Sequence, residues 1–450
     1  MGLVCQTSPD IPHPAAAPPQ RKDAVGPGEA EQQAFDHRIA GYAARCAAAC
    51  AVANDASHGF GATVSLATKL EQEHRADRYA EEMETMLRAW PASPAKRATW
   101  RQDLLRALRR MAGDYLTCDS EGLDRLFTAE ALDATSQFVR EARAFAPAIS
   151  DESLFQALRN LWVTHSVQLL LQTSIVLTPP MFAYSMLYPW TDNCLDDLRL
   201  TRAAKTAFGD WLGLRLTGAK PAPPDLHSEQ VCRLVGMIER FYPRAEFPEV
   251  YLNLRAIHQA QMNSLTQQDA ARTWDEQALL KLSIAKGGTS VLTDACLVRG
   301  WLTDKEAEFM FAYGVVLQIM DDLQDLRDDL ANGHMTIFTY QTSVGPLDGV
   351  TTRLWEFTRT VLSSSRRFGS AQSGSLMSMI QDNLRLLLLQ TVARNQKFYT
   401  PHFVGELEAS TPVRFCYLAR QEKTLAGRYS KVTASIRRSR RIDSLFEMLA

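Results

Sequence analysis

Aspartates near the middle and toward the end of the chain have the spacing of metal ligands. Asp321, Asp322 and Asp325 form a D-D-x-x-D pattern at the end of an apolar run, GVVLQIMDDLQD. In a helix, the first and last of these side chains lie one turn apart on the same face. Carboxylates this close repel one another and resist ionisation unless cations lie between them. Such hard oxygen ligands suit Mg²⁺, which usually keeps waters and completes its shell with substrate phosphates.

A second acidic group lies upstream, in YPWTDNCLDD, which contains Asp192, Asn193, Asp196 and Asp197. It ends a stretch from 160 to 191 that has no Asp, Glu, Lys or Arg. Either group alone is most simply explained as a solvated helix face. Two such groups, each at the end of an apolar helix, can instead face each other across a bundle and hold magnesium and a diphosphate between them.

The segments that must position these groups have the pattern of helices. Apolar residues recur at three- and four-residue spacing, as in DESLFQALRNLWVTHSVQLLL, and alternating strand-type runs are nearly absent. The sequence therefore predicts an all-α protein, a compact bundle of long helices. Pro179 and Pro180 interrupt the charge-free stretch, which is expected to form two buried helices joined by a turn and not one membrane span.

The composition argues against several classes of protein. The formal net charge of the 450-residue chain is −2, whereas binding to nucleic-acid phosphates requires a strong basic excess. The eight cysteines have no Cys-x-x-Cys spacing, so neither a disulfide framework nor a zinc site is indicated. The N-terminal segment also has no pattern of a secretory signal peptide. We therefore expect a cytoplasmic protein that does not bind nucleic acid.

Together the two acidic motifs resemble those of the class I isoprenoid synthase superfamily, which comprises trans-prenyltransferases and class I terpene synthases. Gly314, Gln318 and the three aspartates of the second motif match the prenyltransferase pattern G-x-x-x-Q-x-x-D-D-x-x-D. The resemblance covers roughly residues 150 to 400 and implies an isoprenoid synthase-type helical bundle. It also implies that an allylic prenyl diphosphate is ionised with the help of three Mg²⁺ ions.

The resemblance implies roles for individual residues. The metal ligands would be Asp192, Asn193, Asp196, Asp197, Asp321, Asp322 and Asp325, of which Asp192, Asp196, Asp321, Asp322 and Asp325 would be catalytic. The diphosphate would be bound by Arg199, Arg202, Lys205, Lys286, Gln318, His334, Arg428 and Tyr429. The basic C-terminal segment that carries the last two residues has a second interpretation, as a solvated helix.

Other residues are candidates for the wall of an apolar pocket that would hold the prenyl chain. The aromatic candidates are Trp162, Phe182, Tyr184, Tyr188, Trp190, Phe311 and Tyr313, and most of them are expected to be ordinary core residues. A further segment, AIHQAQMNSL, places the polar residues His258, Gln259, Gln261 and Asn263 on one helix. These polar groups either line the pocket or are satisfied elsewhere, in the core or at a solvent face.

Departures from the family pattern favour one of its branches. Ser185 stands where prenyltransferases carry Gln or His, His334 occupies a lysine position, and no basic G-K-R-x-R-P element for isopentenyl diphosphate is found. We therefore predict a class I terpene synthase, a carbon–oxygen lyase that converts one farnesyl, geranylgeranyl or longer diphosphate and releases diphosphate. The alternatives are a prenyltransferase that condenses an allylic diphosphate with isopentenyl diphosphate, and a non-catalytic helical partner subunit.

The expected domain organisation has three parts. Residues 1–32, rich in Pro, Ala and Gly, are expected to form a disordered tail. Residues 33–150 are interpreted as an N-terminal helical extension, and residues 151–445 as the synthase-like domain. A homodimer, and peripheral contact with a membrane that would receive an apolar product, are both compatible with this assignment.

Overall fold

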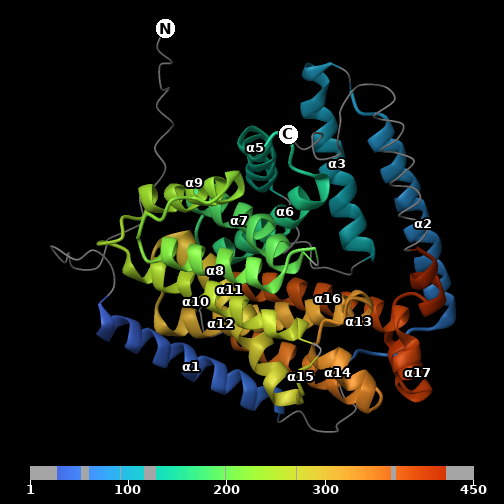
Figure 1. Cartoon of the computed structure of the whole chain (residues 1–450). Coiled ribbons are helices and arrows are strands. Elements are labelled where there is room, and N and C mark those ends of the chain that lie inside the picture. Colours follow the sequence, from blue (N-terminus) through green and yellow to red (C-terminus); the bar gives the residue numbers. More distant parts are fainter. Residues whose placement is uncertain are drawn as a thin grey trace.

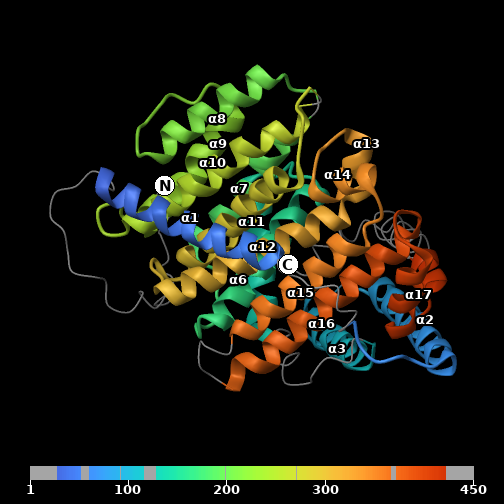
Figure 2. The same ribbon diagram turned by 90° about the horizontal axis from the view of Figure 1, so that it is seen from below.

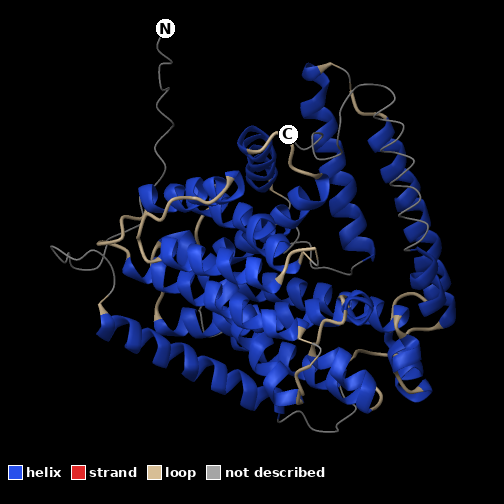
Figure 3. Ribbon diagram, viewed as in Figure 1, coloured by secondary structure: helices blue, strands red, loops and turns tan. Residues whose placement is uncertain are grey.

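The computed structural model describes residues 28–51, 60–91, 93–115, 128–197, 199–269, 271–365 and 371–421. Every regular element in these ranges is a helix (Figures 1 and 3), which confirms the predicted all-α class. The α-helices are α1 (Glu29–Ala51), α2 (Leu66–Arg88), α3 (Pro94–Tyr115), α5 (Ala129–Phe145), α6 (Asp151–Leu170), α7 (Pro179–Asp196), α8 (Arg202–Leu216), α9 (Leu226–Phe241), α10 (Pro248–Ser264), α11 (Glu276–Arg299), α12 (Asp304–Gln324), α13 (Leu326–Asn332), α14 (Ile337–Val344), α15 (Asp348–Ser364), α16 (Ala371–Arg394) and α17 (Pro401–Ser410).

The charge-free stretch forms the two buried helices that the sequence predicts. It spans most of α6 and α7, and Pro179 and Pro180 occupy the first turn of α7, where proline is tolerated because the first N–H groups of a helix have no intrahelical partner. No helix in the described ranges is both long enough and apolar enough to cross a membrane.

The central helices α11 and α12 approach each other closely because two glycines face each other. A Cβ atom on Gly314 would lie 2.1 Å from the carbonyl oxygen of Gly287, and a Cβ atom on Gly287 would lie 2.5 Å from the carbonyl oxygen of Gly314. Any side chain at either position would push the helices apart. This close packing brings Lys286, the neighbour of Gly287, to the same level as the acidic end of α12.

The first and fourth described helices belong to the main bundle. Figure 2 shows α1 running across α11 and α12, and its residues Tyr42, Cys46 and Cys50 belong to the same apolar core as those two helices. Helix α5 contributes Phe138 to a second core that it shares with α6, α7, α9 and α10. Residues on both sides of position 150 thus share this second core. Helix α1 begins at Glu29, inside the expected tail, and residues 1–27 lie outside the described ranges.

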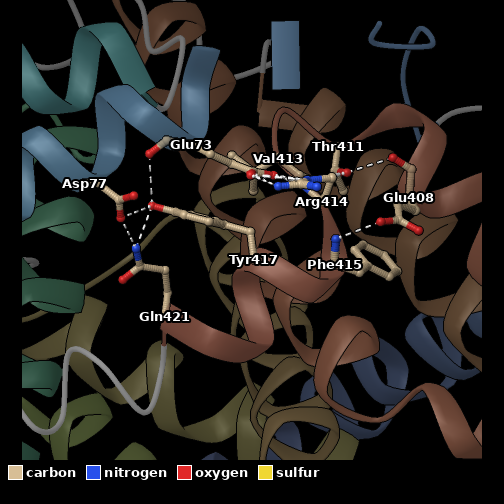
Figure 4. A network of polar contacts seen from close by, with 9 residues as sticks. All are labelled: Glu73, Asp77, Glu408, Thr411, Val413, Arg414, Phe415, Tyr417 and Gln421. Atoms are coloured by element: carbon tan, nitrogen blue, oxygen red, sulfur yellow. Dashed lines mark hydrogen bonds and ion pairs between the residues drawn. The ribbon is translucent and has the colours of Figure 1, made fainter. Parts of the chain in front are cut away.

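Helices α2 and α3 form a hairpin that stands beside the bundle (Figure 1) and has a small core of its own around Trp90 and Trp100. The segment after α17, residues 411–421, contacts helix α2 of this hairpin through hydrogen bonds (Figure 4). The carboxylate of Glu73 in α2 accepts hydrogen bonds from Arg414 Nε at 2.9 Å and Nη2 at 2.6 Å. The hydroxyl of Tyr417 donates to Asp77 at 3.0 Å. Burial alone would raise the pKa of Glu73, but the bonds from Arg414 outweigh it and lower this pKa.

Candidate functional site

Lys286 of α11 lies within electrostatic range of both acidic motifs. It is affected by the charges of Asp192 and Asp196 at the end of α7 and of Asp321 and Asp322 at the end of α12. Burial alone would lower the pKa of Lys286, but the four carboxylates outweigh it and raise this pKa. Lys286 therefore stays charged at neutral pH and attracts carboxylates of both motifs, which lie far apart in the sequence.

The first motif places carboxylates where helix electrostatics disfavours them. Asp192 and Asp196 lie at the C-terminal end of α7, the negative end of the helix dipole, and the last turn has no basic residue. Desolvation raises the pKa of Asp192 to about 6, with Lys286 opposing this rise and Asp196 adding to it. The side-chain amide of Gln261 in α10 donates to Asp192 Oδ1. Two carboxylates at the negative end of a helix dipole do not stabilise the fold. Their position therefore favours a functional role for Asp192 and Asp196.

The second motif is held by hydrogen bonds from neighbouring side chains. Asp322, which is 8% exposed, accepts from Ser283 Oγ at 2.6 Å and from Gln318 Nε2 at 2.8 Å. Asp321 accepts from Arg159 Nη2 of α6 at 2.9 Å. Desolvation raises the pKa of Asp322 to about 6 in spite of these donors. The pKa of Asp325 is also raised to about 6, by desolvation and by the charge of Asp321.

Sequence reasoning missed two charged residues of this cluster. Asp329 in α13 lies near three aspartates of the second motif, and desolvation together with their charges raises its pKa to about 8. Its position four residues after Asp325 is a signal that could have revealed it. Arg159 immediately precedes the charge-free stretch, and its position there gave no indication of a partner in α12.

Some predicted ligands have partners other than the carboxylates around Lys286. Arg199 Nη2 is 2.8 Å from an oxygen of Asp197, and its bonds lower the pKa of Asp197 to about 2. Arg202 pairs with Asp269 at 3.1 Å. The amide of Asn193 is 3.5 Å from Ser153 Oγ. These contacts hold Asp197, Arg199, Arg202 and Asn193 in the structure, and their predicted roles as ligands stay predictions.

Two other predicted ligands border the cluster. His334 interacts with Lys286, Asp196 and Lys205, and burial followed by the charge of Lys286 lowers its pKa. Lys205 is buried and donates to Gln268 Oε1 at 2.9 Å. Both side chains offer nitrogen groups on the side of the cluster formed by the first motif. Arg428 and Tyr429 lie outside the described residues.

An apolar pocket adjoins the first motif. It is a small cavity of about 30 Å³ between α7, α8 and α10. Its lining residues are Tyr184, Leu187, Tyr188, Thr191, Leu212, Leu216, Leu254, Ile257, His258 and Gln261. Because Gln261 both lines the pocket and bonds Asp192, the pocket begins at the carboxylates. Of the other expected aromatic residues, Phe182, Trp190, Phe311 and Tyr313 are buried core residues, and Trp162 is 39% exposed.

Comparison of the chain with models of known protein families, with curated proteins and with solved structures found no match. The function must therefore be argued from the site itself. In the side-chain positions of the described residues, no three Asp, Glu, His or Cys groups are close enough together to hold a metal ion. The cluster nevertheless has more carboxylates than cations, and their repulsion adds to the desolvation that raises the pKa values of Asp192, Asp322, Asp325 and Asp329.

The raised pKa of Asp329 leads to a prediction about stability. Between about pH 4 and pH 8 the folded protein binds a proton at Asp329 that the unfolded chain has lost. The contribution of Asp329 to the free energy of unfolding therefore falls as the pH rises toward 8. We expect Asp329→Asn to stabilise the metal-free protein at pH 8 by about 1 kcal/mol, a value reduced for solvent screening, and to have little effect at pH 4.

Thermal unfolding in the presence of a chelator at the two pH values measures this difference. Asp328→Asn is the matched control, because Asp328 is exposed on the same short helix and its charge is only a lesser cause of the raised pKa of Asp325, so its gain should be smaller than that of Asp329→Asn. An equal gain from Asp329→Asn at both pH values would contradict the assignment of Asp329 to the carboxylate cluster.

Proposed function

We propose that the protein is a magnesium-dependent class I terpene synthase that ionises one linear prenyl diphosphate and releases diphosphate. The observation that carries this proposal is that the charges of carboxylates from both α7 and α12 act on Lys286. An excess of negative charge at the ends of two facing helices suits a substrate with a metal-bound anionic head.

The chemistry of the donor groups fits magnesium, although magnesium would have to draw these carboxylates closer together than they lie in the metal-free structure. Asp192 and Asp196 from one side, and Asp321, Asp322 and Asp325 from the other, offer hard oxygen ligands without a thiolate or imidazole among them. Bound magnesium would neutralise the diphosphate and make it a better leaving group. Three Mg²⁺ ions, as the family resemblance implies, would use both motifs.

The protein's own groups complete the proposed mechanism. Lys286 stabilises negative charge on the leaving diphosphate, and Lys205 and His334 border the same space. The aliphatic and aromatic residues around the small cavity would line the space for the chain once substrate binding enlarges it. Tyr184 and Tyr188 are the aromatic residues among them, and an aromatic ring stabilises positive charge over its face.

One observation favours a synthase over an elongating prenyltransferase. Ser185, at the position where prenyltransferases carry Gln or His, is fully buried and accepts a hydrogen bond from Asn160 Nδ2 at 3.1 Å. It therefore offers nothing to a second diphosphate, and an unpaired anion would be costly to desolvate.

The decisive experiment supplies prenyl diphosphates of different lengths with magnesium, with and without isopentenyl diphosphate. We expect an apolar or volatile product from the allylic substrate alone, detected by gas chromatography of solvent extracts, together with released diphosphate. A lengthened diphosphate formed only when isopentenyl diphosphate is present would support the prenyltransferase instead. Inertness toward every substrate would support the non-catalytic partner subunit.

A further inference from the structure

Arg159 of α6 is an accessible cation beside the second acidic motif. Its Nη2 donates to Asp321 Oδ1 at 2.9 Å, and its side chain is 59% exposed. Desolvation raises the pKa of Asp325, and the charge of Arg159 opposes this rise. Asp321 and Asp325 lie one helical turn apart. One guanidinium therefore acts on two of the carboxylates that are proposed as magnesium ligands.

The contact between Arg159 and Asp321 is easily broken. Asp321 is the one hydrogen-bond partner of the Arg159 side chain in the part of the chain that the structure describes. Both side chains are more than one-third exposed, so water screens their charges and the ion pair is weak. Lys286, by contrast, is affected by four carboxylates from two helices. Arg159 can therefore leave the motif at little cost when a stronger partner is present.

A divalent cation and the guanidinium of Arg159 compete for the same carboxylate oxygens. In the described side-chain positions, no three Asp, Glu, His or Cys groups are close enough to hold a metal ion. The hydrogen bond from Arg159 is one contact that must break before Asp321 becomes a metal ligand. Two positive charges at one carboxylate repel each other, so metal binding favours the release of Arg159.

The released side chain is suited to the anion that the proposed function brings to this place. A guanidinium stays protonated at neutral pH, and its five N–H donors form a planar fork that matches phosphate oxygens. Hydrogen bonds between two charged groups are also stronger than those between neutral groups. Diphosphate bound through magnesium to Asp321 would therefore be a better partner for Arg159 than the exposed carboxylate alone.

We propose that Arg159 is a diphosphate-binding residue that Asp321 holds until metal and substrate arrive, an inference that rests on the proposed function. In the metal-free protein, the guanidinium neutralises Asp321. In the loaded protein, Arg159 exchanges this carboxylate for phosphate oxygens, and no covalent bond is made or broken. Arg159 thus weakens the binding of metal alone and strengthens the binding of diphosphate with metal. This residue couples the two binding events.

Arg159→Gln tests the proposal because it should change the two affinities in opposite directions. Mn²⁺ alone, measured by electron paramagnetic resonance of the free ion, should bind the variant up to about fivefold more tightly, since an exposed ion pair no longer competes. Pyrophosphate, titrated calorimetrically with saturating magnesium, should bind about tenfold more weakly, because a charge-assisted contact is lost. Arg159→Lys keeps the charge without the fork and should have an intermediate pyrophosphate affinity.

Arg45→Gln is the matched control. Arg45 of α1 forms an ion pair of similar exposure with Glu308, at the other end of α12, so its loss should change neither affinity. Circular dichroism establishes that each variant is folded. Unchanged or weaker Mn²⁺ binding by folded Arg159→Gln, or an unchanged pyrophosphate affinity, would overturn the role of Arg159 alone. A wild-type protein that fails to bind Mn²⁺, or pyrophosphate with magnesium, would overturn the proposed function itself.

Discussion

Asp321→Ala is expected to reduce diphosphate release by at least about 10³-fold, because it removes one of the proposed magnesium ligands, whose charge also acts on Lys286. The metal-free protein should nevertheless unfold at the same or a slightly higher temperature. Removing one carboxylate relieves the repulsion that raises the pKa of Asp325 and Asp329. The ion pair between Asp321 and Arg159, which this substitution removes, is largely exposed and contributes little to the free energy of unfolding.

This prediction is checked by steady-state diphosphate release and by thermal unfolding monitored by circular dichroism. Asp328→Ala is the matched control, since Asp328 is a nearby exposed aspartate and should keep full activity. Normal turnover by Asp321→Ala would remove the metal site from the proposal. Loss of activity with an equal loss of helical structure would show that Asp321 serves packing.

Lys286→Met should have the second large effect, a loss of pyrophosphate affinity of at least about 100-fold in the presence of magnesium. Methionine fills similar space but leaves four carboxylates without their shared cation. The pKa values of Asp192 and Asp322, already about 6, should rise further. The variant is therefore expected to lose stability above pH 6, where those groups must ionise without a partner.

Calorimetric titration with pyrophosphate and magnesium measures the affinity directly and needs no substrate. Lys281→Met is the control, because Lys281 is exposed on the same helix, five residues earlier. If the Lys286→Met and Lys281→Met variants both bind pyrophosphate as tightly as the wild type, the diphosphate-binding lysine has been assigned to the wrong helix.

The features predicted correctly from the sequence are those that depend on local pattern. Helical spacing and the Pro179–Pro180 pair were enough to predict two buried helices in the charge-free stretch. The spacing within each acidic motif showed which carboxylates share a helix face. The family resemblance implied a role for Lys286 in binding diphosphate, whereas its interaction with both motifs is seen only in the structure, since spacing within a helix does not reveal its neighbours.

The features that the sequence did not reveal depend on tertiary packing. The pairing of Arg159 with Asp321 depends on how α6 is aligned against α12. Arg202 was assigned to diphosphate by position in the family pattern, yet it lies close to Asp269, a residue much farther along the chain. Likewise, the place of α1 in the main core depends on contacts with helices more than 200 residues away.

The bond between Glu73 and Arg414 also constrains the order in which parts of the chain can fold during synthesis. The two residues are 341 positions apart. At the roughly 5–20 residues per second of protein synthesis, Glu73 leaves the ribosome about 20 to 70 s before its arginine does. During that time the α2–α3 hairpin can form its own small core. The carboxylate of Glu73 stays in water until Arg414 is made, because it cannot be buried without this partner. Attachment of the hairpin to the C-terminal segment is thus a late event of folding, and it closes a loop that contains the whole site.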